Sequence, residues 1–194
     1  MGMIGCFLAV SDDDLKAVID EPSRMQGLLG GEAPPPESAS FFPRIFGGEN
    51  ESDSPADTEA ASGQPKNPPK EFDVDKAWQG IHFLLTQSDW EGEGPLAFIL
   101  HGGAEIDEDL GYGPPHGFTS AEVKTIAAAL APIDPQMLYE KADPAEFAAN
   151  DIYPQIWDEP KEECIEYITS YFGDLKKFVQ ETADSDSALI VYIG

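Results

Sequence analysis

The sequence predicts a single α/β domain, built as a small mixed β-sheet flanked by several helices. Its 194 residues, 41% of them hydrophobic, are enough for one core. Short apolar runs rich in β-forming residues stand near both ends, at residues 3–10 and 188–193. Amphipathic helical patterns fill most of the sequence between these runs. We therefore expect the two terminal strands to be central or near neighbours in the sheet.

The first strand leads directly into a helix. Ser11 is a favoured helix cap, and the carboxylates of residues 12–14 suit the positive end of the helix dipole. Leu15 and Val18 begin an inner apolar face, and Pro22 limits the helix. A strand followed at once by a helix is typical of an α/β domain.

Residues 31–69 interrupt this order. They hold eight of the 17 prolines and many Ser and Glu residues, with little periodicity. This composition predicts a flexible, acid-rich insertion within the domain. An apolar island at residues 41–46 either folds back onto the core or docks elsewhere. We expect it to fold back, because exposed Phe clusters favour aggregation.

Helical signals dominate the remaining sequence. Thr119 and Glu122 have the spacing of a capping box, and Pro160 opens a long apolar stripe. Periodicity alone does not decide residues 95–100, but Pro95 and the glycines that follow the segment favour a short helix. We expect helices from residue 73 or 75 to about 87, at 95–100, from 119 to 132, twice within 135–150 and from 160 to about 182.

Charge excludes several classes of partner. The chain has 37 acidic and 11 basic residues, for a formal net charge of -26. Nucleic acids and anionic lipid surfaces would repel such a protein. No apolar run approaches the length of a membrane span. Cys6 and Cys164 have no metal-type spacing, and we expect both to be reduced thiols in a cytoplasmic protein.

Several motifs occur together in a recognisable order. The start MGMIG, the segment WQGIHFLLT at residues 78–86, GYGPP at 111–115 and IYPQIW at 152–157 precede the last apolar strand. In this order they resemble the YfbM-like family of bacterial proteins, outside residues 31–69. The resemblance implies a single cytoplasmic α/β domain with no established activity, cofactor or catalytic residue. His116 stands where the family often has a basic residue, so anion binding there would need a protonated histidine.

One helix contains the most specific candidate site. Trp78, His82 and Thr86 are spaced i, i+4 and i+8, so they share a face. His82 is either a general base or ligand-orienting group, or a core-margin histidine whose ring nitrogens bond to backbone carbonyls. The candidate pocket comprises Trp78, His82, Thr86, Tyr112, His116, Tyr153 and Trp157.

No cofactor or metal site is predicted. The acidic run at residues 105–109 lacks the Gly and Glu that a calcium-binding EF-hand loop requires at its sixth and twelfth positions. No nucleophile elbow, metal-binding His-Glu helix or Cys-His pair is present.

Two functional hypotheses follow. High acidity without a recognisable catalytic set favours a non-catalytic cytoplasmic binding protein that presents an acidic surface to a basic protein partner. The alternative is an enzyme or small-ligand-binding protein whose pocket is lined by Trp78, His82, Tyr112 and Tyr153. The sequence leaves the oligomeric state open.

Overall fold

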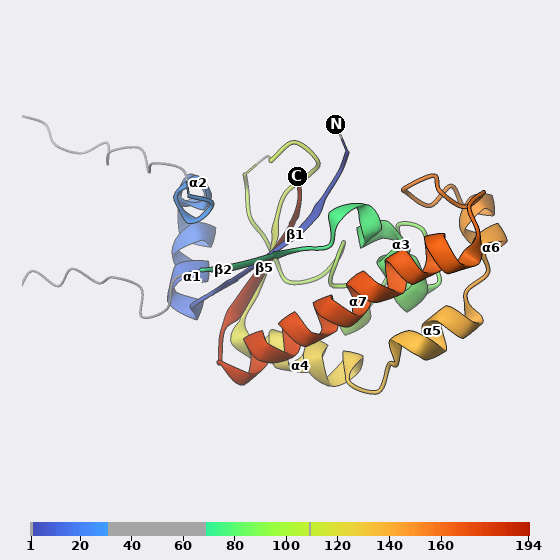
Figure 1. Ribbon diagram of the computed structural model, residues 1–194. Coiled ribbons are helices and arrows are strands. Elements are labelled where there is room, and N and C mark those ends of the chain that lie inside the picture. Colours follow the sequence, from blue (N-terminus) through green and yellow to red (C-terminus); the bar gives the residue numbers. More distant parts are fainter. Residues whose placement is uncertain (1, 31–68, 109) are drawn as a thin grey trace, which may run out of the picture.

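Two strands near opposite ends of the chain form the centre of the fold. The computed structural model describes residues 2–30, 69–108 and 110–194 (Figure 1). Strand β1 (Gly5–Val10) pairs antiparallel with β5 (Ala188–Ile193), with Phe7 opposite Val191. The sheet order is β2-β1-β5-β4-β3, completed by β2 (Lys70–Asp73), β3 (Ala104–Glu105) and β4 (His116–Phe118). The predicted single α/β domain with neighbouring terminal strands is confirmed.

The sheet is antiparallel in all four described pairings, not mixed as predicted. Parallel neighbours require crossover connections that return the chain in the same direction, and none of the described pairings has one. Strands β2, β3 and β4 have two to four residues each and lie beside or beyond the central pair. A hydrophobic pattern identifies a strand without giving its direction, because direction depends on the side from which each connection returns.

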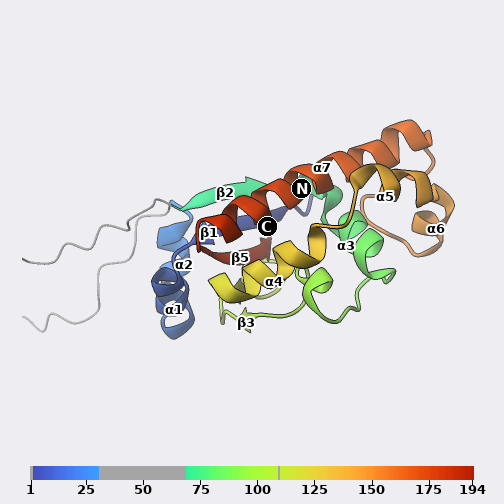
Figure 2. The same ribbon diagram turned by 90° about the horizontal axis from the view of Figure 1, so that it is seen from below.

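Both faces of the central pair are buried. Phe7, Leu189 and Val191 pack on one face, in a core shared with α4 (Ser120–Leu130) and α7 (Lys161–Asp184). Leu8 and Ile190 point to the other face, toward α1 (Asp12–Asp20) and α2 (Arg24–Leu28). The two pairs of helices lie on different sides of the strands (Figures 1 and 2). This double burial explains why both runs are continuously apolar.

Most helix boundaries follow the capping signals. Ser11 Oγ accepts a hydrogen bond from the backbone N–H of Asp14, and Thr119 forms the predicted capping box with Glu122. The long helix begins after Pro160, as expected. The other helical elements are η1 (Asp75–Ala77), α3 (Trp78–Thr86), η2 (Pro95–Ala97), α5 (Pro135–Lys141) and α6 (Pro144–Ala149).

Two lysines satisfy carbonyl groups at helix ends. Lys176 Nζ donates to the carbonyl oxygens of Ala131 and Ile133, at 2.8 and 2.7 Å, just after α4. Lys161 Nζ donates to the carbonyl of Ala142, 2.6 Å away, just after α5. A cation is favourable at the negative end of a helix dipole. These lysines therefore stabilise helix termini and form no ion pair with a described carboxylate.

Replacing Lys176 with methionine should lower the free energy of unfolding by about 1–2 kcal/mol, because two helix-end carbonyls lose a charged donor. The adjacent Lys177 is exposed, and Lys177→Met is the matched control, with little expected change. Urea unfolding of both variants measures the difference. Equal stability of the two variants would contradict the capping role of Lys176.

The predicted insertion at residues 31–69 lies outside the described residues except for Pro69, and so does the island at 41–46. Within the described parts of the chain, no helix has both the length and the apolarity needed to cross a membrane.

Candidate functional site

Helix α3 places its predicted site residues on one face. The Trp78 side chain is 1% exposed and His82 has no exposed surface. Thr86 Oγ1 donates to the carbonyl oxygen of His82 at 2.8 Å, so the hydroxyl is used within the helix. The predicted i, i+4, i+8 alignment therefore places these side chains on a face packed inside the protein, not on the exposed lining of an open pocket.

The loop of residues 88–94, called the 88–94 loop below, is held against this face by three side chains. Its consecutive carbonyls at Asp89, Trp90 and Glu91 each accept a hydrogen bond. The donors are Gln79 Nε2 to Asp89 at 3.1 Å, His101 Nε2 to Trp90, and His82 Nε2 to Glu91 at 3.1 Å. Gly92 lies so close to α3 that an added Cβ would be 3.1 Å from Thr86 Cγ2. The loop therefore has a fixed backbone and covers His82.

The bond to Glu91 determines the protonation of His82. Because a carbonyl oxygen only accepts, Nε2 carries the proton and Nδ1 is a bare acceptor. Nδ1 is buried and has no hydrogen-bond partner among the described residues. Burial lowers the pKa of His82, and the nearby His101 lowers it further; the bond to Glu91 opposes the shift. A general base must contact its reactant, and a reactant could reach this ring only if the 88–94 loop moved away.

An aromatic group surrounds Trp78. The ring centroids of Trp90 and Tyr153 lie 5.8 and 6.0 Å from that of Trp78. Trp78 Nε1 donates to the carbonyl of Met3 at 3.3 Å, and the Met3 backbone N–H donates to Tyr153 Oη at 3.2 Å. The backbone N–H of Tyr153 donates to Gln79 Oε1 at 2.8 Å. Gln79 thus bridges the 88–94 loop and the segment after α6.

The other predicted site residues occupy different surroundings. Tyr112 is 50% exposed. His116 lies half-buried in β4, and burial lowers its pKa despite a hydrogen bond to the backbone of Gly102. Trp157 packs on Phe147, with ring centroids 4.4 Å apart. The structure thus gathers Trp78, His82, Thr86 and Tyr153, while Tyr112, His116 and Trp157 contribute no described contact to this cluster.

The described thiols are poor nucleophiles. Cys164 is buried and Cys6 half-buried, and both are free. Burial is the main cause that raises the pKa of each thiol, so both remain protonated at neutral pH. Among the described residues, no three His, Cys, Asp or Glu side chains are grouped so as to hold a metal ion.

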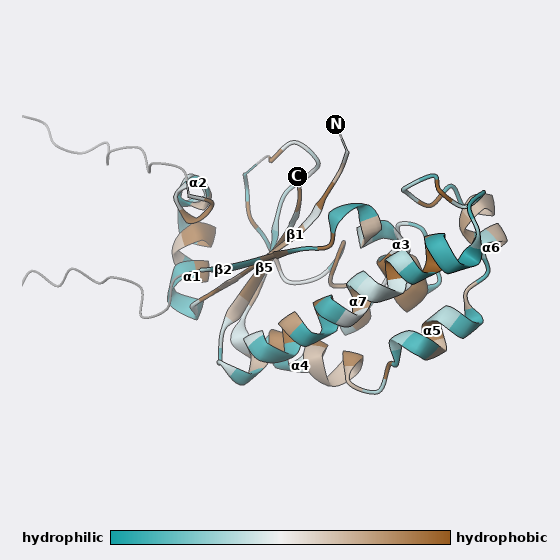
Figure 3. Cartoon of the chain, in the orientation of Figure 1, coloured by the Kyte–Doolittle hydropathy of each residue, from teal (hydrophilic) through white to brown (hydrophobic). Residues whose placement is uncertain are grey.

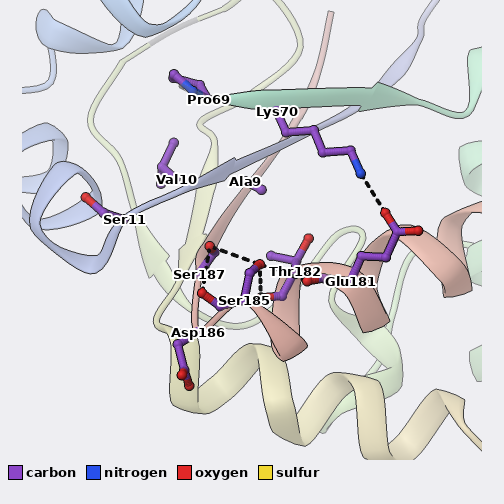
Figure 4. A pocket seen from close by; sticks show the side chains of 10 residues that line it. All are labelled: Ala9, Val10, Ser11, Pro69, Lys70, Glu181, Thr182, Ser185, Asp186 and Ser187. Carbon is purple, nitrogen blue, oxygen red and sulfur yellow. Dashed lines mark hydrogen bonds and ion pairs between the residues drawn. The ribbon is translucent and has the colours of Figure 1, made fainter. Parts of the chain in front are cut away.

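A cavity of about 530 Å³ lies between β1 and the end of α7 (Figure 4). Lys70 Nζ and Glu181 Oε2 form an ion pair of 2.6 Å at its side. The hydroxyls of Thr182 and Ser185 donate to helix carbonyls at Phe178 and Glu181, both at 2.8 Å. These polar groups are already used within the fold, and no histidine or cysteine lines the cavity. The lining residues are Ala9, Val10, Ser11, Pro69, Lys70, Glu181, Thr182, Ser185, Asp186 and Ser187.

Sequence reasoning did not identify Gln79, Trp90 or His101. A polar Gln79 within the apolar segment WQGIHFLL was an available signal, since a buried amide needs partners. Trp90 and His101 stand in irregular segments, where no periodicity connects them to α3. Their role depends on how the loop folds back, which is a tertiary property.

Comparisons with known proteins agree with the fold. No curated protein matches the chain. A crystal structure titled as a protein of unknown function, YfbM from Escherichia coli, is similar with a TM-score of 0.64 and 16% sequence identity. The match covers 98% of this chain and 99% of that chain, and at this identity it shows the fold alone. The sequence model of DUF1877, a domain of unknown function, matches residues 1–192. The predicted resemblance to YfbM is confirmed, and the chain belongs to the DUF1877 family.

Proposed function

We propose that this protein is a non-catalytic cytoplasmic binding protein that presents an acidic surface to a basic protein partner. One observation carries the proposal: the charge distribution of residues 134–166, called the acidic end below. This segment contains ten acidic and two basic residues, and all ten acidic residues are exposed. They lie on α5 and α6, at the N-caps of these two helices, in the loop that follows α6 and on the first turns of α7.

The carboxylates of the acidic end are not neutralised within the described structure. None of them belongs to any of the four described ion pairs, which all lie elsewhere. Lys161, one of the two basic residues, directs its Nζ to backbone carbonyls instead. The field of these carboxylates therefore extends into solvent, where it attracts cations over about one Debye length, roughly 8–10 Å.

The acidic end also occupies one end of the molecule (Figure 1). Helices α5, α6 and the start of α7 form the end of the molecule that lies away from α1 and α2 (Figure 1). The outward surface of this part of α7 is mainly hydrophilic (Figure 3). Clustered charge on one end of a protein increases association rates and favours partners of opposite charge.

Affinity capture with matched charge variants tests the proposal. The tagged protein is used as bait in a lysate of the organism that encodes it. The capture is run at about 50 mM salt, where charges are weakly screened, and at about 500 mM salt, where they are strongly screened. The recovered partner is then purified, and its association rate constant is measured. We expect neutralising Glu159, Glu162, Glu163 and Glu166 to Gln to slow association about 10-fold or more.

A control set removes the same number of charges elsewhere. Its four substitutions are Asp13→Asn, Glu71→Gln, Glu105→Gln and Asp107→Asn, all at exposed positions. The control should retain most of the association rate. Recovery of no basic protein at low salt, or an equal loss of association rate in both variants, would overturn the proposal that the acidic end binds a basic partner.

One observation favours the alternative of a small-ligand pocket. The unpaired Nδ1 of His82 is a buried acceptor that a hydrogen-bond donor of a ligand could satisfy. Such a ligand would require the 88–94 loop to open, and Tyr112 would take no part in the described arrangement. A thermal-shift screen against metabolites, repeated with His82→Ala, distinguishes this alternative from the acidic surface.

A further inference from the structure

We propose that Trp90 is the anchor by which the protein binds a lysine or arginine side chain of its basic partner. This inference rests on the proposed function and names a contact point within it. The starting observation is exposure: the Trp90 side chain is 53% exposed, although it packs on the buried Trp78. A large aromatic ring at the surface is typical of the residues that dominate binding energy.

The position of Trp90 is fixed before any partner arrives. Its backbone N–H donates to Asp89 Oδ1 at 3.0 Å, and its carbonyl accepts from His101. The carbonyls on either side are held by Gln79 and His82. A side chain on a fixed backbone loses little conformational entropy on binding, so more of the contact energy appears as affinity.

The surroundings of Trp90 favour a cation. Asp89, Glu91 and Glu93 stand in the same loop, and none of them forms an ion pair with a described residue. Among the described residues, the cations that lie over aromatic rings are Lys70 over Phe178 and Lys161 over Tyr139. Trp90 therefore has no described cation on its ring. A Trp face attracts Lys or Arg, and neighbouring carboxylates strengthen the attraction.

Trp90 also lies close to the acidic end. The rings of Trp90 and Tyr153 are 5.8 and 6.0 Å from the same Trp78 ring, so their centroids are at most 11.8 Å apart. Tyr153 belongs to the loop of the acidic end that follows α6. One partner could therefore contact both. A second copy of this chain is a less suitable occupant, because two chains with a net charge of -26 repel each other.

The direct probe is a fluorescently labelled hexa-arginine peptide, with hexa-citrulline as the uncharged comparison. Anisotropy gives the dissociation constants for the wild type, Trp90→Leu and Tyr112→Leu. Tyr112 is the matched control, since it is also exposed, at 50%, and also lies in an acid-rich loop. We expect Trp90→Leu to weaken hexa-arginine binding by about 2- to 30-fold, the range of a cation–π contact. Tyr112→Leu should bind hexa-arginine as the wild type does. Trp90→Leu should not weaken binding of the citrulline peptide.

Indole NMR signals locate the contact independently. The peptide should shift the indole N–H signal of Trp90, assigned by its loss in Trp90→Phe, and leave that of buried Trp157 unchanged. Equal affinity of the wild type and Trp90→Leu, or no binding by the wild type, would overturn the anchor. A Trp90 signal that shifts with protein concentration alone would instead assign this surface to self-association. If the native partner is captured and binds Trp90→Leu normally, the proposed function survives and the anchor fails.

Discussion

Replacing Trp78 with alanine is expected to lower the free energy of unfolding by about 3–5 kcal/mol, the usual cost of truncating a buried aromatic residue. Trp78 is 1% exposed and joins β1, the 88–94 loop and Tyr153. Its Cβ lies so close to Gly5 that a Cβ added there would be 2.6 Å away. The strand cannot move in to fill the vacated space without losing its pairing with β5. Since small domains have a total stability of about 5–15 kcal/mol, the loss is a large share.

Urea unfolding, followed by far-ultraviolet circular dichroism, measures this change. Trp90→Ala is the matched comparison, because its ring is 53% exposed, and we expect a loss below about 1 kcal/mol. Trp78→Phe should be intermediate, since packing is partly kept while the bond from Nε1 to Met3 is lost. Similar losses at Trp78 and Trp90 would show that the aromatic cluster is not organised around Trp78.

Acidification should destabilise the protein through His82. Burial lowers the pKa of His82 and of His116 below the ordinary value of 6.5. The unfolded chain therefore binds more protons than the folded one in this range, and stability rises with pH. The part of the free energy of unfolding that depends on these histidines is fully present above about pH 6.5 and is lost as the pH falls from there toward the pKa of the folded state. For each histidine, the free energy of unfolding changes by at most about 1.4 kcal/mol per pH unit.

The groups that face His82 define the control. His101 opposes its protonation and Asp89 favours it, while the Nδ1 atom that would gain the proton has no acceptor among the described residues. His82→Gln replaces the ring with an amide donor for the Glu91 carbonyl and removes the titration. Between about pH 6.5 and 5, the free energy of unfolding of His82→Gln should change less with pH than that of the wild type. The reason is that the variant lacks one group that takes up a proton on unfolding. Parallel pH profiles for the two proteins would contradict this account.

The sequence predicted those features that local chemistry determines. Apolar runs marked β1 and β5, since a strand buried on both faces must be apolar at every position. The caps at Ser11 and Thr119 were identified because one side chain satisfies a backbone donor a few residues away. Each of these signals needs only a short stretch of chain.

Features that depend on distant partners were not predictable. Strands β3 and β4 have two and three residues, too few for a recognisable alternation. Strand β4 pairs with the edge of β5, and β3 pairs in turn with β4. The candidate site was identified in part, since the shared face of α3 follows from helical spacing. The closure of that face by the 88–94 loop depends on bonds to Gln79, His82 and His101, which span up to 11 residues.

The pairing of β1 with β5 has a consequence for synthesis. The backbone groups of Ile4 and Gly194 exchange two hydrogen bonds, at 2.8 and 2.9 Å, across nearly the whole sequence. During translation, β1 leaves the ribosome before its central partner β5, which follows only after α7 is complete. Until then Phe7 and Leu8 have no β5 beside them, so the nascent chain must hold an incomplete sheet edge that invites mispairing. Folding of this domain therefore finishes after release of its last strand, and chaperone demand should be greatest just before that moment.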